Sequence, residues 1–241
     1  NFKDTYHNGV EVGKVYIWNG VYFNNDYDSG IQWVSYEISN DWYSNANSNI
    51  IPHMGISVAF NKNCRLLAVG SSMIDSGSVT VDNNGKPDQY KGQVDAYKFT
   101  ISTDGNNIIS WNKLPQSLTV DNYSHFGKSI SIGDDGTILA VGAPGQITAG
   151  VLHPGEAGNV YIYQIDGITA SQIADVHYSS LHSVTWKQIK TIPGKPHSSF
   201  GTSVSLNLAG DTLVAGGPTY DGSVNGTGLG YVEVYTQVFS D

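Results

Sequence analysis

The chain has 241 residues, with 21 acidic and 12 basic side chains and a formal net charge of -9. Proteins that bind nucleic acid or anionic membranes need a basic surface to neutralise phosphates, so this balance argues against both kinds of partner. No apolar stretch reaches the roughly 20 residues needed to cross a bilayer, and the single cysteine, Cys64, excludes an internal disulfide.

The composition favours short strands joined by tight turns. The chain has 28 glycines and 15 tyrosines, and only 14% of its residues are charged. Aromatic residues favour extended backbone, and glycine supplies the positive φ angles of hairpin turns. We therefore expect an all-β fold.

The expected strands fall into four types, A to D, which recur in the same order along the chain. The first two, before residue 50, match types C and D, and three units that begin with type A follow. The units recur about every 70 residues, and a repeat of four short strands is typical of a β-propeller blade. Type A is expected at 54–58, 126–130 and 200–204; type B at 66–70, 138–142 and 213–217; type C at 13–18, 92–97, 158–163 and 230–235; and type D at 33–35, 111–114 and 186–189.

Each type has a chemistry that suits its place in a blade. Type B is apolar at successive positions, which predicts that neighbouring sheets cover both of its faces. Type A alternates polar and apolar residues, so its two faces meet different surroundings. Type D carries one tryptophan per unit, and we interpret these residues as packing between sheets rather than as sugar-stacking platforms. They are Trp33, Trp111 and Trp186.

The third unit resembles the FG-GAP repeat of the propeller of integrin α subunits. The fourth unit is similar, with a glycine in place of the alanine before Pro218, and the second has Met54 in place of the phenylalanine and Gly70-Ser71-Ser72 in place of Gly-Ala-Pro. The resemblance implies a toroid of antiparallel four-stranded blades, in which A strands line the axis and partners bind the D-to-A and B-to-C loops. The residues that carry it are Phe126-Gly127, Val141-Gly142-Ala143-Pro144 and Gly158-Asn159-Val160-Tyr161-Ile162-Tyr163.

The whole chain, 1–241, is expected to form a single, partial β-propeller of about three and a half blades. Its units are 1–50 (strands C and D only), 51–120, 121–195 and 196–241 (strands A to C). If the two ends met in one blade, strand C would be present twice, and an open arc exposes sheet edges. We therefore expect a larger propeller of roughly six to eight blades, completed by the same longer chain or by another subunit.

The long B-to-C loops, 71–91, 145–157 and 219–229, are the first candidates for a contact surface. Asp82, Asn84 and Asp88 in the first of these loops have the spacing of calcium ligands. A polar turn that uses Gly85 is the alternative that we favour. No other cofactor is implied.

Other candidate residues lie in loops. Asn122 and Asn225 match the N-glycosylation pattern and favour an extracellular location. His53, His125 and His197 precede type A strands and could gather as a metal or anion site, although loop histidines without a ligand are the favoured interpretation. Aromatic residues outside the repeat are candidates for a contact patch; they are Tyr22, Phe23, Tyr27, Trp42 and Tyr43.

No catalytic motif accompanies these features, so we expect the chain not to be an enzyme. Cys64 lies in a turn beside Arg65, and acidic pairs such as Asp134 and Asp135 lie in turns where local hydrogen bonds account for them. The sequence favours a recognition or structural scaffold module at an extracellular, cell or particle surface, which binds protein or glycan through propeller loops or assembles into a larger structure. A lectin or hydrolase that uses the channel mouth is the alternative.

Overall fold

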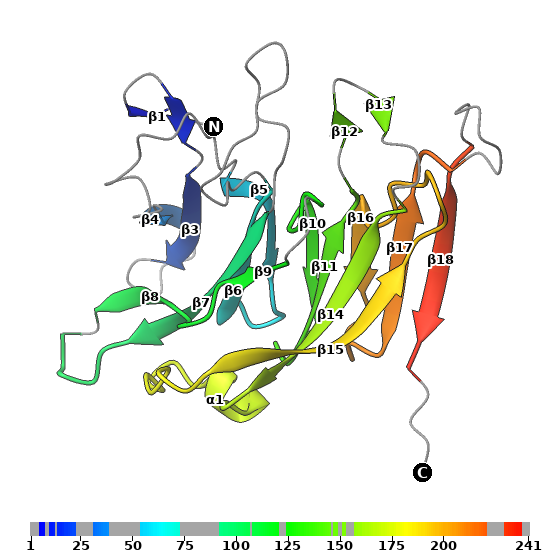
Figure 1. Cartoon of the computed structure of the whole chain (residues 1–241). Coiled ribbons are helices and arrows are strands. Elements are labelled where there is room, and N and C mark those ends of the chain that lie inside the picture. The colour runs from blue at the N-terminus through cyan, green and yellow to red at the C-terminus, as the bar shows by residue number, and fades with distance from the viewer. Residues whose placement is uncertain are drawn as a thin grey trace.

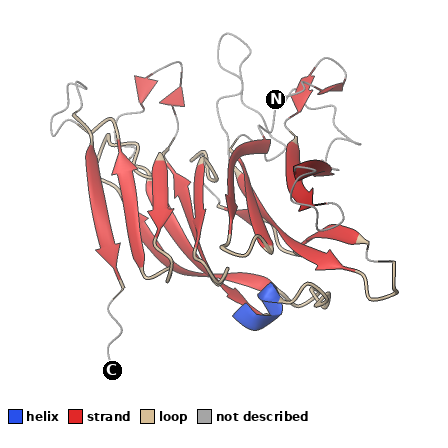
Figure 2. Cartoon of the chain, turned by 180° about the vertical axis from the view of Figure 1, so that it is seen from behind, coloured by secondary structure: helices blue, strands red, loops and turns tan. Residues whose placement is uncertain are grey.

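The computed structural model describes twelve stretches of the chain in an all-β fold (Figure 2). The stretches contain antiparallel sheets of two to five strands and the short helix α1 (Ala170–Ala174). No helix in these stretches is long and apolar enough to span a bilayer. They are residues 5–7, 10–12, 14–22, 31–38, 54–72, 92–106, 108–120, 124–145, 147–148, 151–152, 157–220 and 229–237.

Four sheets follow one another along the chain, and we number them 1 to 4. Sheet 1 pairs β3 (Val15–Tyr22) with β4 (Ile31–Ile38). Sheet 2 has the order β5 (Met54–Phe60), β6 (Leu66–Ser71), β7 (Gln93–Ile101) and β8 (Ile109–Lys113), and β9 (Leu118–Thr119) also pairs with β7. Sheet 3 has the order β10 (Ser129–Ile132), β11 (Ile138–Ala143), β14 (Asn159–Asp166) and β15 (Thr185–Pro193). Sheet 4 has the order β16 (Ser203–Leu206), β17 (Thr212–Gly217) and β18 (Tyr231–Thr236).

Each expected strand corresponds to one of these strands, and types A to D are hydrogen-bonded in that order. Two further hairpins were not expected from the sequence. They are β1 (Thr5–His7) with β2 (Val10–Val12), and β12 (Ile147–Thr148) with β13 (Val151–Leu152).

The four sheets lie side by side in chain order (Figure 1), and β10 lies between β5 and β16. A hydrophobic cluster fills the space between each successive pair of sheets. Leu67 and Val69 of β6 belong to the cluster between sheets 1 and 2, whereas Leu66 and Ala68 belong to the cluster between sheets 2 and 3. All four are at most 1% exposed. The expectation that both faces of this type B strand are covered is confirmed.

The phenylalanine-glycine pairs lie in turns, not in strands. Sheets 3 and 4 begin at Ser129 and Ser203, so the strand starts expected at 126 and 200 were three residues too early. The φ angles of Gly127 and Gly201 are 84° and 89°, in the left-handed region that glycine adopts readily. The glycine turns the chain so that the strand starts only after it.

An insertion between β14 and β15 packs on the neighbouring sheet. It contains α1, whose first turn is capped by Thr169 and whose Ile173 is fully buried in the cluster between sheets 2 and 3. The fully buried ammonium group of Lys98, on β7, donates a 2.7 Å hydrogen bond to the carbonyl oxygen of Asp175. Burial lowers the pKa of Lys98, while the charge of Asp175 raises it. The insertion of sheet 3 is thus attached to sheet 2.

Candidate interaction surface

One serine and two glycines make a contact that recurs between neighbouring sheets. Ser129 Oγ of sheet 3 donates a 2.8 Å hydrogen bond to the carbonyl oxygen of Gly201, in the turn before sheet 4. Gly142 lies against the same oxygen, and a Cβ placed on it would be only 2.0 Å away. Glycine is therefore required at this position, because a side chain would push the two sheets apart.

The same contact joins sheets 2 and 3. Ser57 Oγ donates a 2.6 Å hydrogen bond to the carbonyl oxygen of Gly127. A Cβ on Gly70 would lie 2.2 Å from that oxygen. The repeated serine and glycine positions of the sequence are thus the contact points of neighbouring sheets.

A second glycine contact lies where each type C strand begins. A Cβ on Gly92 would be 1.9 Å from the carbonyl oxygen of Phe126, and one on Gly158 would be 2.2 Å from that of Phe200. The main chain of the next sheet occupies the place of a side chain in both cases. These glycines therefore also belong to the sheet-to-sheet contact.

Sheet 4 carries the same residues with no further sheet against them in the described part of the chain. Ser203 lies opposite Gly216, as Ser129 lies opposite Gly142. A Cβ on Gly216 would meet only the side chain of Ser203 within 4 Å, with the hydroxyl oxygen at 2.6 Å. The contact residues are in place, but their main-chain partner is not among the described residues.

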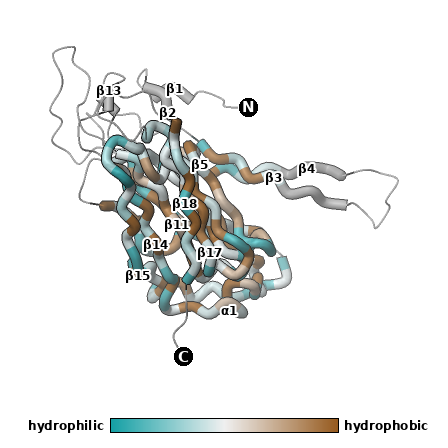
Figure 3. Tube along the Cα trace, turned by 90° about the vertical axis from the view of Figure 1, so that its right-hand side faces the viewer, coloured by the Kyte–Doolittle hydropathy of each residue, from teal (hydrophilic) through white to brown (hydrophobic). Residues whose placement is uncertain are grey.

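The exposure of apolar side chains also indicates that no described sheet covers this face of sheet 4. Val214 is 38% exposed, whereas Ala140, at the equivalent position of sheet 3, is fully buried. Val232 and Val234 are 66% and 65% exposed, and their equivalents in sheets 2 and 3 are buried. Figure 3 views the molecule from the side on which β18 lies. We call Ser203, Val214, Gly216, Val232 and Val234 the open face of sheet 4.

A second exposed apolar row lies on β5 of sheet 2. Ile56, Val58 and Phe60 are between 40% and 52% exposed. Sheet 1, which packs on this side of sheet 2, contains only β3 and β4 in the described part of the chain, strands of types C and D. Exposed apolar rows on strand faces are typical of interaction surfaces, so both ends of the row of sheets are candidates.

Most of the predicted ligand and modification sites lie outside the described residues. This holds for Asp82, Asn84 and Asp88, for Asn122 and for Asn225. Most of the B-to-C loops lie there too, so the calcium, glycosylation and loop-contact predictions stay predictions. Within the stretches that the structure describes, no three His, Cys, Asp or Glu side chains are grouped so that they could hold a metal ion.

The histidines do not occupy equivalent positions. His125 lies two residues before Gly127, whereas the residue two positions before Gly201 is Ser199. The φ angles of His125 and Ser199 are 53° and 51°. His197 lies further upstream, and His53 is outside the described residues. The structure therefore places His125 and His197 at different points of their turns.

The remaining polar candidates lie in turns. The Asp135 carboxylate accepts hydrogen bonds from the main-chain nitrogen and the hydroxyl of Thr137, at 2.8 and 2.7 Å. Asp134 forms an ion pair with Lys62 at 3.3 Å, and Cys64 is exposed in a turn. Local hydrogen bonds therefore account for Asp135, whereas Asp134 takes part in a contact with the turn between β5 and β6 of sheet 2.

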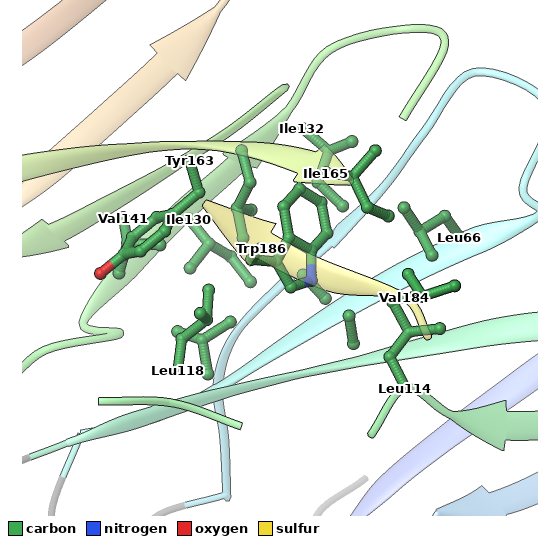
Figure 4. Close-up of a cluster of buried hydrophobic side chains, with 14 of the residues drawn as sticks. Leu66, Leu114, Leu118, Ile130, Ile132, Val141, Tyr163, Ile165, Val184 and Trp186 are labelled. Carbon is green, nitrogen blue, oxygen red and sulfur yellow. The ribbon is translucent and has the colours of Figure 1, made fainter. Parts of the chain in front are cut away.

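The tryptophans of type D strands pack between sheets, as the sequence predicted for Trp111 and Trp186. Trp186 is 4% exposed in the cluster between sheets 2 and 3 (Figure 4). Trp111 packs against the cluster between sheets 1 and 2, with its ring edge-on to Phe99 at 5.3 Å. The side chain of Trp33 lies outside the described residues, as do the side chains of all the aromatic residues expected outside the repeat.

The sequence predicted an open arc, but the residues that form the open face of sheet 4 were not recognised from it. A signal was present, because Ser203 and Gly216 are third copies of the serine and glycine that contact the next sheet in the two preceding units. Comparisons with models of known protein families and with curated proteins find no match to this chain.

Proposed function

We propose that this chain is part of a β-propeller of the FG-GAP type and works as a non-catalytic recognition and scaffold module. Further four-stranded sheets, from the same longer polypeptide or from another subunit, continue the row at the open face of sheet 4. The D-to-A and B-to-C loops bind a protein or glycan at an extracellular, cell or particle surface. The module needs no cofactor for this role.

The arrangement of the sheets supports the propeller. Three A strands, β5, β10 and β16, are neighbours, as expected if they surround one axis. An apolar cluster joins each successive pair of sheets, and the strands present in each sheet follow the same A-to-D order. Radial repetition of such sheets is the architecture that these features favour.

The open face is the observation that carries the scaffold role. Val232 and Val234 present apolar surface beside Ser203 and Gly216, the pair that accepts a neighbouring sheet elsewhere in the molecule. An exposed apolar face with the contact residues of an internal interface is expected to be covered by another sheet.

Sedimentation velocity of the purified chain tests this role. We expect the wild-type chain to associate with increasing concentration, and Val232→Lys to sediment as a monomer because it places a charge in the apolar face. Ile108→Lys is the matched control, since Ile108 is 56% exposed but lies beside β8, away from sheet 4. A wild-type chain that stays monomeric at all concentrations, or equal association of Val232→Lys, would contradict the proposal.

A further inference from the structure

Two tyrosine rings and a carboxylate surround one ammonium group where the loop before sheet 4 meets β18. Tyr220 lies in the loop after β17, and Tyr231 and Glu233 lie on β18. The two rings meet edge to face, with centroids 5.1 Å apart and an interplanar angle of 71°. The ammonium group of Lys195 is 4.3 Å from the ring centroid of Tyr231, 5.1 Å from that of Tyr220 and 3.3 Å from Glu233 Oε1. We call Tyr220, Tyr231 and Glu233 the cation cage.

Contacts other than those of the Lys195 side chain hold the cage in place. The ring of Tyr231 is parallel to that of the fully buried Phe200, with an interplanar angle of 6° and centroids 5.6 Å apart. The hydroxyl oxygen of Tyr231 accepts a 3.0 Å hydrogen bond from the main-chain nitrogen of Lys195. The hydroxyl of Tyr235 donates a hydrogen bond to Glu233 Oε2. The cage therefore does not depend on the ammonium group for its shape.

The occupant of the cage is a mobile kind of side chain in an exposed position. Lys195 is 44% exposed along its side chain. Its ammonium group is strongly hydrated and sits on a flexible four-carbon stem. Lys195 can therefore exchange its contacts with the rings for contacts with water while its main-chain hydrogen bond to Tyr231 stays in place.

The cage lies on the side of sheet 4 that faces sheet 3, and both of these sheets are described. Tyr231 packs against the cluster between them. In sheet 3 the fourth strand places Thr191 and Pro193 beside the positions equivalent to Glu233 and Tyr231, and both residues are exposed. A fourth strand beside β18 would lie in the plane of sheet 4 in the same way, so it would not fill the cage.

We propose that the cation cage binds the quaternary ammonium group of a small solute, and that Lys195 is its internal competitor. A quaternary ammonium group has no N–H group to hydrate, so it loses less hydration than the primary ammonium group of lysine when it contacts the rings. Aromatic rings arranged around a cation are the usual means by which proteins recognise choline-like ligands. The carboxylate of Glu233 balances the charge of the bound cation.

Titration with choline chloride tests the site. Binding is followed by the ring signals of ¹³C-labelled tyrosine in the intact chain. We expect saturable binding that is at least about tenfold tighter in Lys195→Ser than in the wild type, because the variant removes the competing ammonium group. The uncharged analogue 3,3-dimethyl-1-butanol, which has the same shape as choline, is expected not to bind. Absence of saturable binding to Lys195→Ser, or equal binding of the uncharged analogue, would overturn the proposal.

Variants of the cage and a control for net charge complete the test. In the Lys195→Ser background, Tyr220→Ala removes one ring and Glu233→Gln removes the charge with little change of size, and we expect each to weaken choline binding at least about tenfold. Choline binding that survives both changes would contradict the site. Lys187→Ser is the matched control, because it removes a lysine from the exposed side of β15, opposite Gln164 and away from the cage. It should bind choline as the wild type does, and tighter binding by Lys187→Ser would show that net charge rather than the cage sets the affinity.

The outcome is independent of the proposed scaffold role. Val232→Lys, on the open face, is expected to keep the choline affinity of the wild type, because its side chain points away from sheet 3. Retained self-association without choline binding in any variant would overturn the cage alone.

Discussion

The hydroxyl of Ser129 lies 2.8 Å from the carbonyl oxygen of Gly201, although the two residues are 72 positions apart in the chain. Ser57 and Gly127, 70 positions apart, make the same hydrogen bond at 2.6 Å. The separation is one repeat unit in both cases. The repeated residues therefore include those that make the contact between neighbouring sheets, as well as those that form the strands of one sheet.

Gly142→Ala is expected to destabilise the protein by about 2–3 kcal/mol, because its Cβ would overlap a main-chain oxygen that cannot move without separating two sheets. Gly216→Ala is the matched control, since its Cβ meets only the rotatable hydroxyl of Ser203. We expect it to cost less than about 1 kcal/mol. Urea unfolding measures both values, and equal costs would show that the contact at Gly142 is not as tight as described.

Ser129→Ala removes the hydroxyl that donates to Gly201, and we expect it to lower the free energy of unfolding by about 1 kcal/mol. Ser203→Ala, at the same place on the open face, should change it by less than about 0.5 kcal/mol. Thermal unfolding of the two variants and the wild type makes the comparison. A larger loss for Ser203→Ala than for Ser129→Ala is the opposite of what the contact predicts.

Trp186→Ala removes the indole that packs between sheets 2 and 3. We expect a loss of about 3–5 kcal/mol, the range for a buried large aromatic residue. Trp111→Ala, whose ring is less buried, should cost less. The measurement is chemical denaturation, and a loss below 1 kcal/mol for Trp186→Ala would be inconsistent with the packing in Figure 4.

Lys98→Met tests the buried ammonium group through pH. Burial lowers the pKa of Lys98 in the folded protein below its ordinary value of 10.5. The unfolded chain therefore binds more protons at alkaline pH, and the wild-type protein gains stability from this group as pH rises toward 10.5. We expect the stability of the wild type relative to Lys98→Met to increase between pH 8 and 10. A difference that is constant or falls over this range would contradict the lowered pKa.

The strands could be predicted because their signals are local. Polar and apolar residues alternate in Ser129–Ile132, and apolar residues follow one another in Ile138–Ala143, according to which faces of each strand are covered. Glycine marks the turns between strands. The packing role of Trp186 followed from its recurrence once per unit.

The rest depends on contacts between residues that are distant in the chain. The need for glycine at 142 comes from a carbonyl in the next sheet, and Lys98 is explained only by the insertion that covers it. Helix α1 was missed because its few residues carry no extended periodicity.

Thiol labelling at equivalent positions of sheets 3 and 4 tests most directly whether the open face is an unfilled sheet interface. In a Cys64→Ser background, which removes the exposed native thiol, Ala140→Cys and Val214→Cys are compared by their rates of reaction with a thiol reagent. Ala140 is fully buried and Val214 is 38% exposed. The account predicts that in dilute protein Val214→Cys reacts at least about 100-fold faster than Ala140→Cys, and that its rate falls as the protein concentration rises. Equal rates at the two positions, or a rate at Val214→Cys that does not depend on concentration, would contradict it.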